Sequence, residues 1–376
     1  MASIRKIALT GATGIVLGVA GMAGAQEVPD LPQVVIWSAY DTGSSGHAQA
    51  VAIGSALKNQ TGSDLRILPG RNDISRMVPL RDGRAQFSSA GIAAYYAQEG
   101  VDVFLTPEWG PQPIRVLLAS NPDHNQGLGA SEESGITSLE EIRGRRVAAV
   151  VGSPAINNGT EAILAHAGLT WDDVERIDFP GYGAAWEGML NGQADVAWGA
   201  TTLGAAYQLA NSPRGLHWLT VPHDDEAGWE RLNAIAPHIF RHVATEGANI
   251  SADTPHEGTN YPYPILITMA DQDQELVAGM TQAMITLFPD YEGAAPGING
   301  WALDRQNTQW ILPFHDGAIE VLRGMDAWSD EDQAHNDRLV ARQEALRAAW
   351  DELMAENLSG DALAEAWEEV RAGIDG

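Results

Sequence analysis

The chain has 376 residues and a formal net charge of −28, so there is room for two domains of ordinary size. Such acidity argues against nucleic acid as a partner, because phosphates would be repelled, and high net charge favours a dissolved monomer. The absence of cysteine excludes disulfides, thiol nucleophiles and thiolate metal sites.

Residues 1–25 are predicted to form a secretory signal peptide. Arg5 and Lys6 precede a short apolar run that ends at Ala23-Gly24-Ala25, an A-x-A cleavage pattern. The alternative is a membrane anchor, but a spanning helix needs about 20 strongly apolar residues, and this run is short and rich in glycine. We expect cleavage before Gln26 and an exported protein with a net charge of −30, because two positive charges leave with the signal.

The chain then repeats one order of elements. VVIWSAY (34–40) predicts a strand, a Ser-Gly turn and a helix follow, and RILPG (66–70), a second helix pattern and GRAQFSSAG (83–91) complete a unit. About 110 residues later, RVAAVVG (146–152), a helix pattern, RIDFPG (176–181), another helix pattern and GQADVAWGA (192–200) repeat that order. Apolar strands that alternate with helices predict mostly parallel sheets covered on both faces.

Two similar units predict an α/β fold of two lobes joined by a hinge, like a type II periplasmic binding protein, with added C-terminal helices. We assign residues 26–127 and 266–376 to lobe 1 and residues 128–265 to lobe 2. Residues 128–136 would leave lobe 1 and residues 261–270 would return to it, and two such crossings make a hinge.

The C-terminal part is predicted to be helical. Ser329 and Asp332 match a capping box with Asp in the usual Glu position, and an apolar stripe follows at helical spacing: Leu339, Leu346, Trp350 and Leu353. A second short helix is predicted from Asp361 to Arg371. We expect these helices to pack along a lobe, with a partner-binding helix as the alternative.

The turns after the first strand of each unit have the chemistry of an anion site. Gly43, Ser44, Ser45 and Gly46 lie at the start of one helix and Ser153 at the start of the other, where free N–H groups and the helix dipole attract negative charge. We expect the two turns to face each other across a cleft. The alternative is that each serine only caps its helix.

The sequence shows no phosphate-loop lysine, no H-E-x-x-H and no G-x-S-x-G, so we expect no nucleotide, metal, cofactor or catalytic set. Aromatic side chains near the predicted strand ends suggest walls for a ligand with apolar surface. These are Trp37, Tyr40, Tyr182, Trp186 and Trp198. The alternative is that they belong to the cores, and periodicity does not place both Trp37 and Tyr40 in the cleft. Arg71, Asn72 and Asp73 follow RILPG and would add charge at the rim or floor of the cleft.

Several motifs in this order resemble the TAXI-type solute receptors of TRAP transporters over about residues 33 to 324. They are WSAYDTGSSGH, RRVAAVVGSPAINN, GLTWDDV, GMLNGQADVAWGATT, YPILIT and LPFHDGAIEVLRG. The resemblance implies a periplasmic receptor that delivers a small carboxylate or amino acid to a TRAP membrane permease. It also implies ligand contacts from residues 43–46, from residues 153–156 and from residues 200–202, which include Thr201 and Thr202. We add Asn157, which follows the second of these turns, to the candidate ligand-binding residues.

This chain departs from the family where S-P-A-I stands in place of the usual G-S-G-T, and Trp198 adds bulk nearby. A larger or more apolar acid is therefore plausible as ligand. Two other classes stay open: an exported enzyme on a similar scaffold, and a receptor for an ATP-driven importer.

Overall fold

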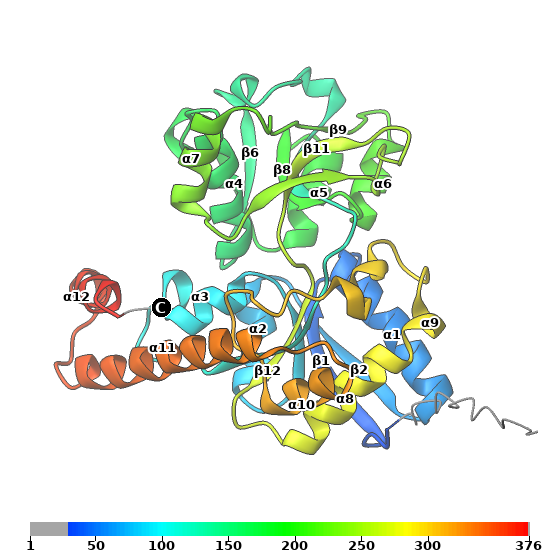
Figure 1. Ribbon diagram of the computed structural model, residues 1–376. Coiled ribbons are helices and arrows are strands. Elements are labelled where there is room, and N and C mark those ends of the chain that lie inside the picture. The colour runs from blue at the N-terminus through cyan, green and yellow to red at the C-terminus, as the bar shows by residue number, and fades with distance from the viewer. Residues whose placement is uncertain (1–28, 375–376) are drawn as a thin grey trace, which may run out of the picture.

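The computed structural model describes residues 29–374, which form two α/β lobes stacked one above the other (Figure 1). The predicted signal peptide at residues 1–25 lies outside the described residues. Within residues 29–374, no helix combines the length and the apolar character that a membrane crossing requires.

Lobe 1 is built on a five-stranded sheet of order β2-β1-β3-β12-β4. The strands are β1 (Val34–Tyr40), β2 (Asp64–Gly70), β3 (Phe87–Ala90), β4 (Ile114–Ala119) and β12 (Ile265–Met269). The helices are α1 (Ser45–Thr61), α2 (Asp73–Arg81), α3 (Ala93–Glu99), α8 (Gln274–Thr286), α9 (Phe288–Tyr291) and α10 (Asp316–Gly324), with short 3₁₀ turns η1 (Asp102–Phe104), η5 (Ile298–Trp301) and η6 (Leu303–Arg305).

Lobe 2 has a second five-stranded sheet, of order β7-β6-β8-β5-β9, and a separate β10-β11 hairpin. The strands are β5 (Gln126–Ala130), β6 (Arg146–Val150), β7 (Glu175–Phe179), β8 (Val196–Ala200), β9 (His217–Trp218), β10 (Phe240–Ala244) and β11 (His256–Asn260). The helices are α4 (Pro154–His166), α5 (Tyr182–Leu190), α6 (Gly204–Ala210) and α7 (Glu226–Ile235), with 3₁₀ turns η2 (Glu132–Ser134), η3 (Glu140–Ile142) and η4 (Trp171–Asp173).

The predicted repeat and the fold class are confirmed. In each sheet the first strand of the unit lies between the second and the third: β1 between β2 and β3, and β6 between β7 and β8. These pairs are parallel, as the alternation of strands and helices predicts. Each sheet is nevertheless mixed, because β12 and β5 add to β3 and β8 as antiparallel strands.

The chain crosses between the lobes twice, through residues 120–125 after β4 and residues 261–264 before β12. The first crossing precedes the expected segment 128–136, because residues 126–130 already pair with β8 inside the lobe 2 sheet. The second crossing lies at the start of the expected segment 261–270, whose later residues form β12.

His124 lies in the first crossing and is fully buried. Its Nδ1 is 3.1 Å from Oγ1 of Thr202. Burial, with a further contribution from His242, lowers the pKa of His124 to about 3. The folded protein therefore holds this ring neutral at a pH where an unfolded chain protonates it.

The burial of His124 predicts that the protein becomes less stable to unfolding in acid. Between pH 6.5 and about 3 the unfolded state binds one more proton at His124 than the folded state does, so stability falls as the pH falls through this window. At pH 5 the loss from this one ring is about 2 kcal/mol. Urea unfolding of the wild type and of His124→Gln at pH 7 and pH 5 should show a smaller loss in the variant. Equal losses would contradict the assignment.

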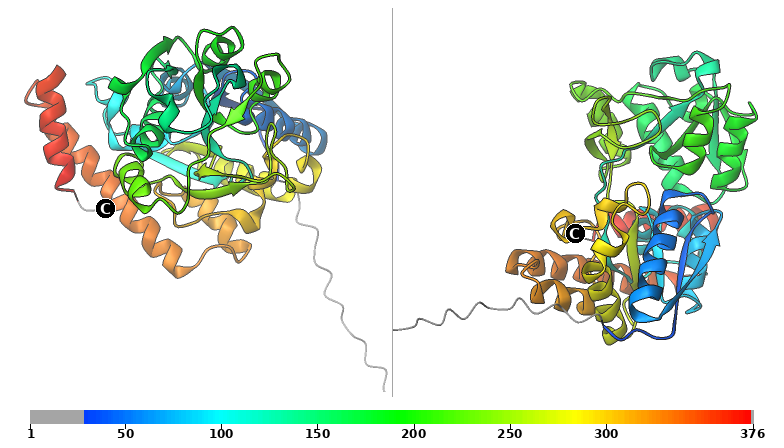
Figure 2. Two further views of the ribbon diagram at one scale, coloured as in Figure 1. Left: turned by 90° about the horizontal axis from the view of Figure 1, so that it is seen from above. Right: turned by 90° about the vertical axis from the view of Figure 1, so that its right-hand side faces the viewer.

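The C-terminal helices α11 (Asp330–Met354) and α12 (Gly360–Ala372) extend to one side of lobe 1 (Figure 2). The predicted capping box is present, with Ser329 and Asp332 bonding reciprocally. A small apolar cluster joins the two helices: Leu346, Trp350, Leu353, Leu363 and Trp367. The side chain of Glu99, at the end of α3, is buried and pairs with Arg342 and Arg371, so these helices are fastened to lobe 1 at α3.

Candidate functional site

The predicted turn of lobe 1 lies at the interface between the lobes. Ser44 caps α1 by accepting a hydrogen bond from the His47 N–H at 3.2 Å. Oγ of Ser45 accepts a hydrogen bond from Oγ1 of Thr202 at 3.3 Å. The Gly43 carbonyl accepts one from the Gly204 N–H, also at 3.3 Å. The start of α1 therefore meets the turn after β8.

The close approach at this turn depends on glycine. Gly43 has φ of 94°, which a residue with Cβ adopts only under strain. A Cβ on Gly46 would lie 3.1 Å from the Tyr263 hydroxyl and 3.3 Å from Cγ of Pro264. The first turn of α1 thus packs directly against the second lobe crossing, with little space for any larger side chain.

The predicted turn of lobe 2 meets a different segment of lobe 1. Ser153 is the N-cap residue of α4, but its side chain makes no capping bond within the helix. Its Oγ accepts a hydrogen bond from the Asp73 N–H at 3.3 Å, and the Ala155 N–H donates to Oδ2 of Asp73 at 3.0 Å. The two serine turns therefore do not pair with each other: each contacts another element of the opposite lobe.

Arg71 and Asn72 lie beside this contact. The Arg71 side chain is exposed, and its carbonyl accepts a hydrogen bond from the Tyr182 N–H at 2.9 Å. Asn72 caps α2 through a capping box with Ser75, and its Nδ2 donates to the Val151 carbonyl at 3.0 Å. Both residues therefore join the lobes, Arg71 through its backbone.

A buried charged cluster occupies the lobe 1 side of the interface. Nη2 of Arg76 donates to Oδ1 of Asp73 at 2.8 Å, and both side chains have no exposed surface. The Tyr40 hydroxyl donates to the same carboxylate oxygen, and Cζ of Arg76 lies 3.7 Å from the centre of the Tyr40 ring. Nη1 of Arg76 is 3.5 Å from the Ser89 carbonyl oxygen, and its Nε makes no hydrogen bond to the described residues.

Burial is the largest influence on the pKa values of the three side chains in this cluster. Burial raises the pKa of Asp73, while the Arg76 charge and the hydrogen bonds from Tyr40 and Ala155 act in the opposite direction. For Arg76, burial works against the charge, but Tyr40 and Asp73 outweigh it and raise the pKa. Burial and the neighbouring Asp73 raise the pKa of Tyr40 well above its ordinary value. The guanidinium is therefore charged at neutral pH.

Sequence reasoning missed Arg76, whereas it named Asp73, with Arg71 and Asn72, as a charged residue at the cleft. The available signal was DISRMVPLR, in which an arginine follows an aspartate by three residues on one helix. Among residues 29–374, Arg76 is the only arginine or lysine that is fully buried. A buried, ion-paired arginine at a lobe interface is the feature that most clearly indicates a functional site.

Tyrosines line the interface around Arg76. The Tyr40 and Tyr182 rings lie 5.6 Å apart across it, and Tyr261 and Tyr263, in the second crossing, lie 6.2 Å apart. Tyr96 of lobe 1 is linked to Tyr261 through the His238 ring. We call these five residues (Tyr40, Tyr96, Tyr182, Tyr261 and Tyr263) the tyrosine cluster. Burial raises the pKa of Tyr263 to about 12, so its hydroxyl remains a neutral donor.

The three predicted tryptophans lie in the cores of the lobes. Trp37 is fully buried and packs edge-on against Phe87, with ring centres 6.4 Å apart. Trp186 donates through Nε1 to the Trp198 carbonyl at 3.0 Å and packs on Trp218. The Trp198 ring lies against α4, where a Cβ on Gly159 would be 2.8 Å from it. Core packing, the alternative for these residues, accounts for Trp37 and Trp198, while Trp186 packs in the core and also lines a cavity between the lobes.

The remaining predicted residues form hydrogen bonds, most of them to the backbone, close to the interface. Both atoms of the Asn157 amide bond the backbone of Val150, at 2.9 Å each, which fixes the end of β6 to α4. Oγ1 of Thr201 donates to the Glu246 carbonyl and accepts from the Asn125 N–H. Of these residues only Thr202 contacts the opposite lobe through its side chain, at Ser45.

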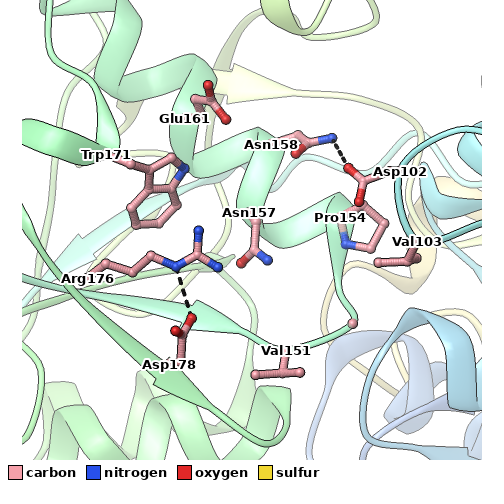
Figure 3. Close-up of a pocket in the computed structure, with 11 residues that line it drawn as sticks. Asp102, Val103, Val151, Pro154, Asn157, Asn158, Glu161, Trp171, Arg176 and Asp178 are labelled. Atoms are coloured by element: carbon pink, nitrogen blue, oxygen red, sulfur yellow. Dashed lines mark hydrogen bonds and ion pairs between the residues drawn. The ribbon is translucent and has the colours of Figure 1, made fainter. Parts of the chain in front are cut away.

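Two cavities open beside the interface. One, of about 410 Å³, lies next to the start of α4, where Asn158 of lobe 2 donates to Asp102 of lobe 1 at 3.1 Å (Figure 3). The other, of about 210 Å³, is lined by both lobes, among them Ser44, Tyr182, Trp186 and Leu203. Within residues 29–374, no three His, Asp or Glu side chains are grouped so as to hold a metal ion.

The model of the NMT1-like family matches residues 48–324 of this sequence. The chain belongs to the NMT1-like family. The matched region runs from within α1 to the end of α10. Strand β1 and the turn at residues 43–46 precede it, so Trp37, Tyr40, Gly43, Ser44, Ser45 and Gly46 lie outside the match. Helices α11 and α12 lie beyond it.

Solved structures match this chain only at low similarity. The alkanesulfonate-binding protein SsuA from Xanthomonas axonopodis pv. citri, bound to MOPS, is 14% identical with a TM-score of 0.46, over 90% of this chain and 99% of that one. The periplasmic aliphatic sulphonate binding protein SsuA from Escherichia coli is 14% identical with a TM-score of 0.41, over 91% and 86%. At these values the likeness carries no information on the ligand of this chain. No protein of curated function matches the sequence.

Proposed function

We propose that this protein is an exported receptor that captures a small organic anion between its lobes and releases it, chemically unchanged, to a membrane transporter. The observation that carries the proposal is the buried Arg76 guanidinium at the lobe interface, whose Nε is not engaged by the described residues. An acid is the natural partner, because a planar guanidinium donates in parallel to two carboxylate oxygens.

The start of α1 adds backbone donors to this site. Ser45 and Gly46 lie in the first turn of the helix, where N–H groups have no partner inside the helix and the dipole is positive. The tyrosine cluster supplies aromatic faces for the rest of the ligand. The ligand class is therefore a carboxylate or amino acid with an apolar or aromatic body, held by tyrosines in place of the predicted tryptophans.

The two crossings at residues 120–125 and 261–264 provide the means of capture. A pair of lobes joined by short connections closes around a ligand by hinge rotation, and contacts such as Thr202 with Ser45 form only when the lobes meet. The exported location rests on the signal-peptide pattern of residues 1–25, and we place the mature protein in the periplasm.

A TRAP-type permease is the partner we favour, because the motifs of this chain resemble TAXI-type receptors in order and spacing. An ATP-driven importer is the alternative partner. Reconstitution in vesicles separates the two: uptake with a TRAP permease needs an ion gradient and no ATP, whereas uptake through an ATP-driven importer stops without ATP.

A thermal-shift screen of organic acids and amino acids tests the receptor function. A ligand present at 1,000 times its Kd should raise the free energy of unfolding by about 4 kcal/mol, because it binds only the folded state. The amide or alcohol analogue of each hit, which lacks the negative charge, should give no shift. Mass spectrometry after incubation should recover the acid intact, and a converted product would favour the enzyme alternative. Shifts with neutral solutes alone would refute an anion receptor.

A further inference from the structure

A carboxylate of lobe 1, that of Asp73, lies at the N-terminus of α4. Oδ2 of Asp73 accepts a hydrogen bond from the Ala155 N–H at 3.0 Å, in the first turn of that helix. The Asp73 N–H in turn donates to the Gly152 carbonyl at 3.1 Å and to Oγ of Ser153 at 3.3 Å. The position where a helix N-terminus would bind an acid group of a ligand is therefore taken by a side chain of the protein.

The neighbouring contacts hold α4 in this arrangement. Nδ2 of Asn72 donates to the Val151 carbonyl, and Asn158 donates to Asp102 one turn further along α4. Figure 3 shows Pro154 and Asn158 of α4 facing Val103 and Asp102 of lobe 1. The first turn of α4 is thus packed against lobe 1 over its length, with Asp73 as its only carboxylate partner among the described residues.

The site holds one buried cation, and that cation is already paired with Asp73. Asp73 and Arg76 are both fully buried, and their charges cancel. Arg76 is also the only fully buried arginine or lysine among residues 29–374, and its Nε makes no hydrogen bond to the described residues. A ligand acid group at this guanidinium would share it with Asp73, which leaves one net negative charge at the site. A second acid group inside the tyrosine cluster would be buried without a counter-charge, which is strongly unfavourable.

We propose that Asp73 acts as a built-in substitute for a second ligand acid group, so that the cleft selects acids with a single negative group facing Arg76 and rejects matched diacids. The inference rests on the proposed receptor function and specifies its ligand class. The same residue joins α2 to α4 across the interface, so it also contributes to closure of the lobes.

Calorimetry with matched pairs of acids tests this selection. The probes are hexanoate against adipate and 3-phenylpropanoate against phenylsuccinate, which differ within each pair by one carboxylate. The wild type should bind the monoacid of at least one pair ten-fold or more tighter than the diacid. In Asp73→Asn, which keeps the size of the side chain and removes its charge, this preference should fall at least ten-fold. Asp73→Ala, which also frees the Ala155 N–H, should show the same fall or a reversed preference.

Asp172→Asn is the matched control, because it removes one negative charge from an exposed position in lobe 2 and should leave the preference unchanged. If Asp73→Ala does not fold, Asp73→Asn alone decides the result. Equal binding of monoacids and diacids by the wild type, or the same preference in Asp73→Asn as in the wild type, would overturn the inference while leaving the receptor function in place. Failure of every acid to bind the wild type would overturn both.

Discussion

Arg76→Gln should weaken binding of the acid by about 10²–10³-fold, which corresponds to about 2.7–4.1 kcal/mol. The guanidinium is the only buried cation at the interface among residues 29–374, and a glutamine amide in its place donates to the ligand without a charge. Isothermal calorimetry of wild type and variant with the strongest acid from the thermal-shift screen measures the effect.

The same substitution should also destabilise the fold, because it leaves the Asp73 carboxylate buried without its ion pair. Removing one partner of a buried pair costs about 3–5 kcal/mol. The double variant Asp73→Asn/Arg76→Gln separates the two effects: it has no unpaired charge, so it should recover most of the stability while its affinity for the acid stays low. A double variant that binds the acid as tightly as the wild type would show that Arg76 does not hold the ligand.

The fold was predictable because its signals are local. Each strand of the repeat is a short apolar run, each helix has its own period, and the order strand-helix-strand-helix-strand recurs in both lobes. The antiparallel strands β5 and β12 were not predicted in their places, because each pairs with strands far away in the sequence. The position of the first crossing was missed for the same reason.

The predictable part of the candidate site is the position of its turns. Serine and glycine at a strand-to-helix junction are read from the sequence alone, and Ser45 and Ser153 both lie where the lobes meet. Which residues these serines contact depends on how the two lobes pack together. Ser45 meets Thr202, and Ser153 meets Asp73, and no pattern in the sequence indicates which elements of two lobes will touch when the lobes pack.

Strand parity explains why a tyrosine and not a tryptophan of β1 reaches the interface. Residues 37 and 40 are an odd number of positions apart, so their side chains leave opposite faces of the strand. Trp37 packs into the lobe 1 core against Phe87, and Tyr40 points to Asp73, Arg76 and Tyr182. The sequence shows that only one of the two can face the ligand, and the packing of α2 and of lobe 2 decides which one does.

Trp198→Ala is expected to destabilise the protein by about 3–5 kcal/mol, in the range for removal of a large core side chain. The indole is 4% exposed and fills the space between β8 and Gly159 of α4, so the truncation leaves a cavity under the helix that carries Ser153 and Ala155. Urea unfolding measures the loss. Trp171→Ala is the control: this ring is half-buried on η4 beneath the Arg176 side chain, and its removal should cost about 1 kcal/mol or less.

Trp198→Ala should lower the stability of the protein but leave its affinity for the acid nearly unchanged. Because Trp198 packs inside lobe 2, the fraction of Trp198→Ala that remains folded should bind the acid within about three-fold of the wild type, which is under 1 kcal/mol. Tyr182→Ala, by contrast, removes a ring that faces Tyr40 across the interface and should weaken binding more than Trp198→Ala does. If Trp198→Ala lost more than ten-fold in affinity with little change in urea unfolding, the tryptophan would line the ligand site after all, and the assignment of that role to the tyrosine cluster would be wrong.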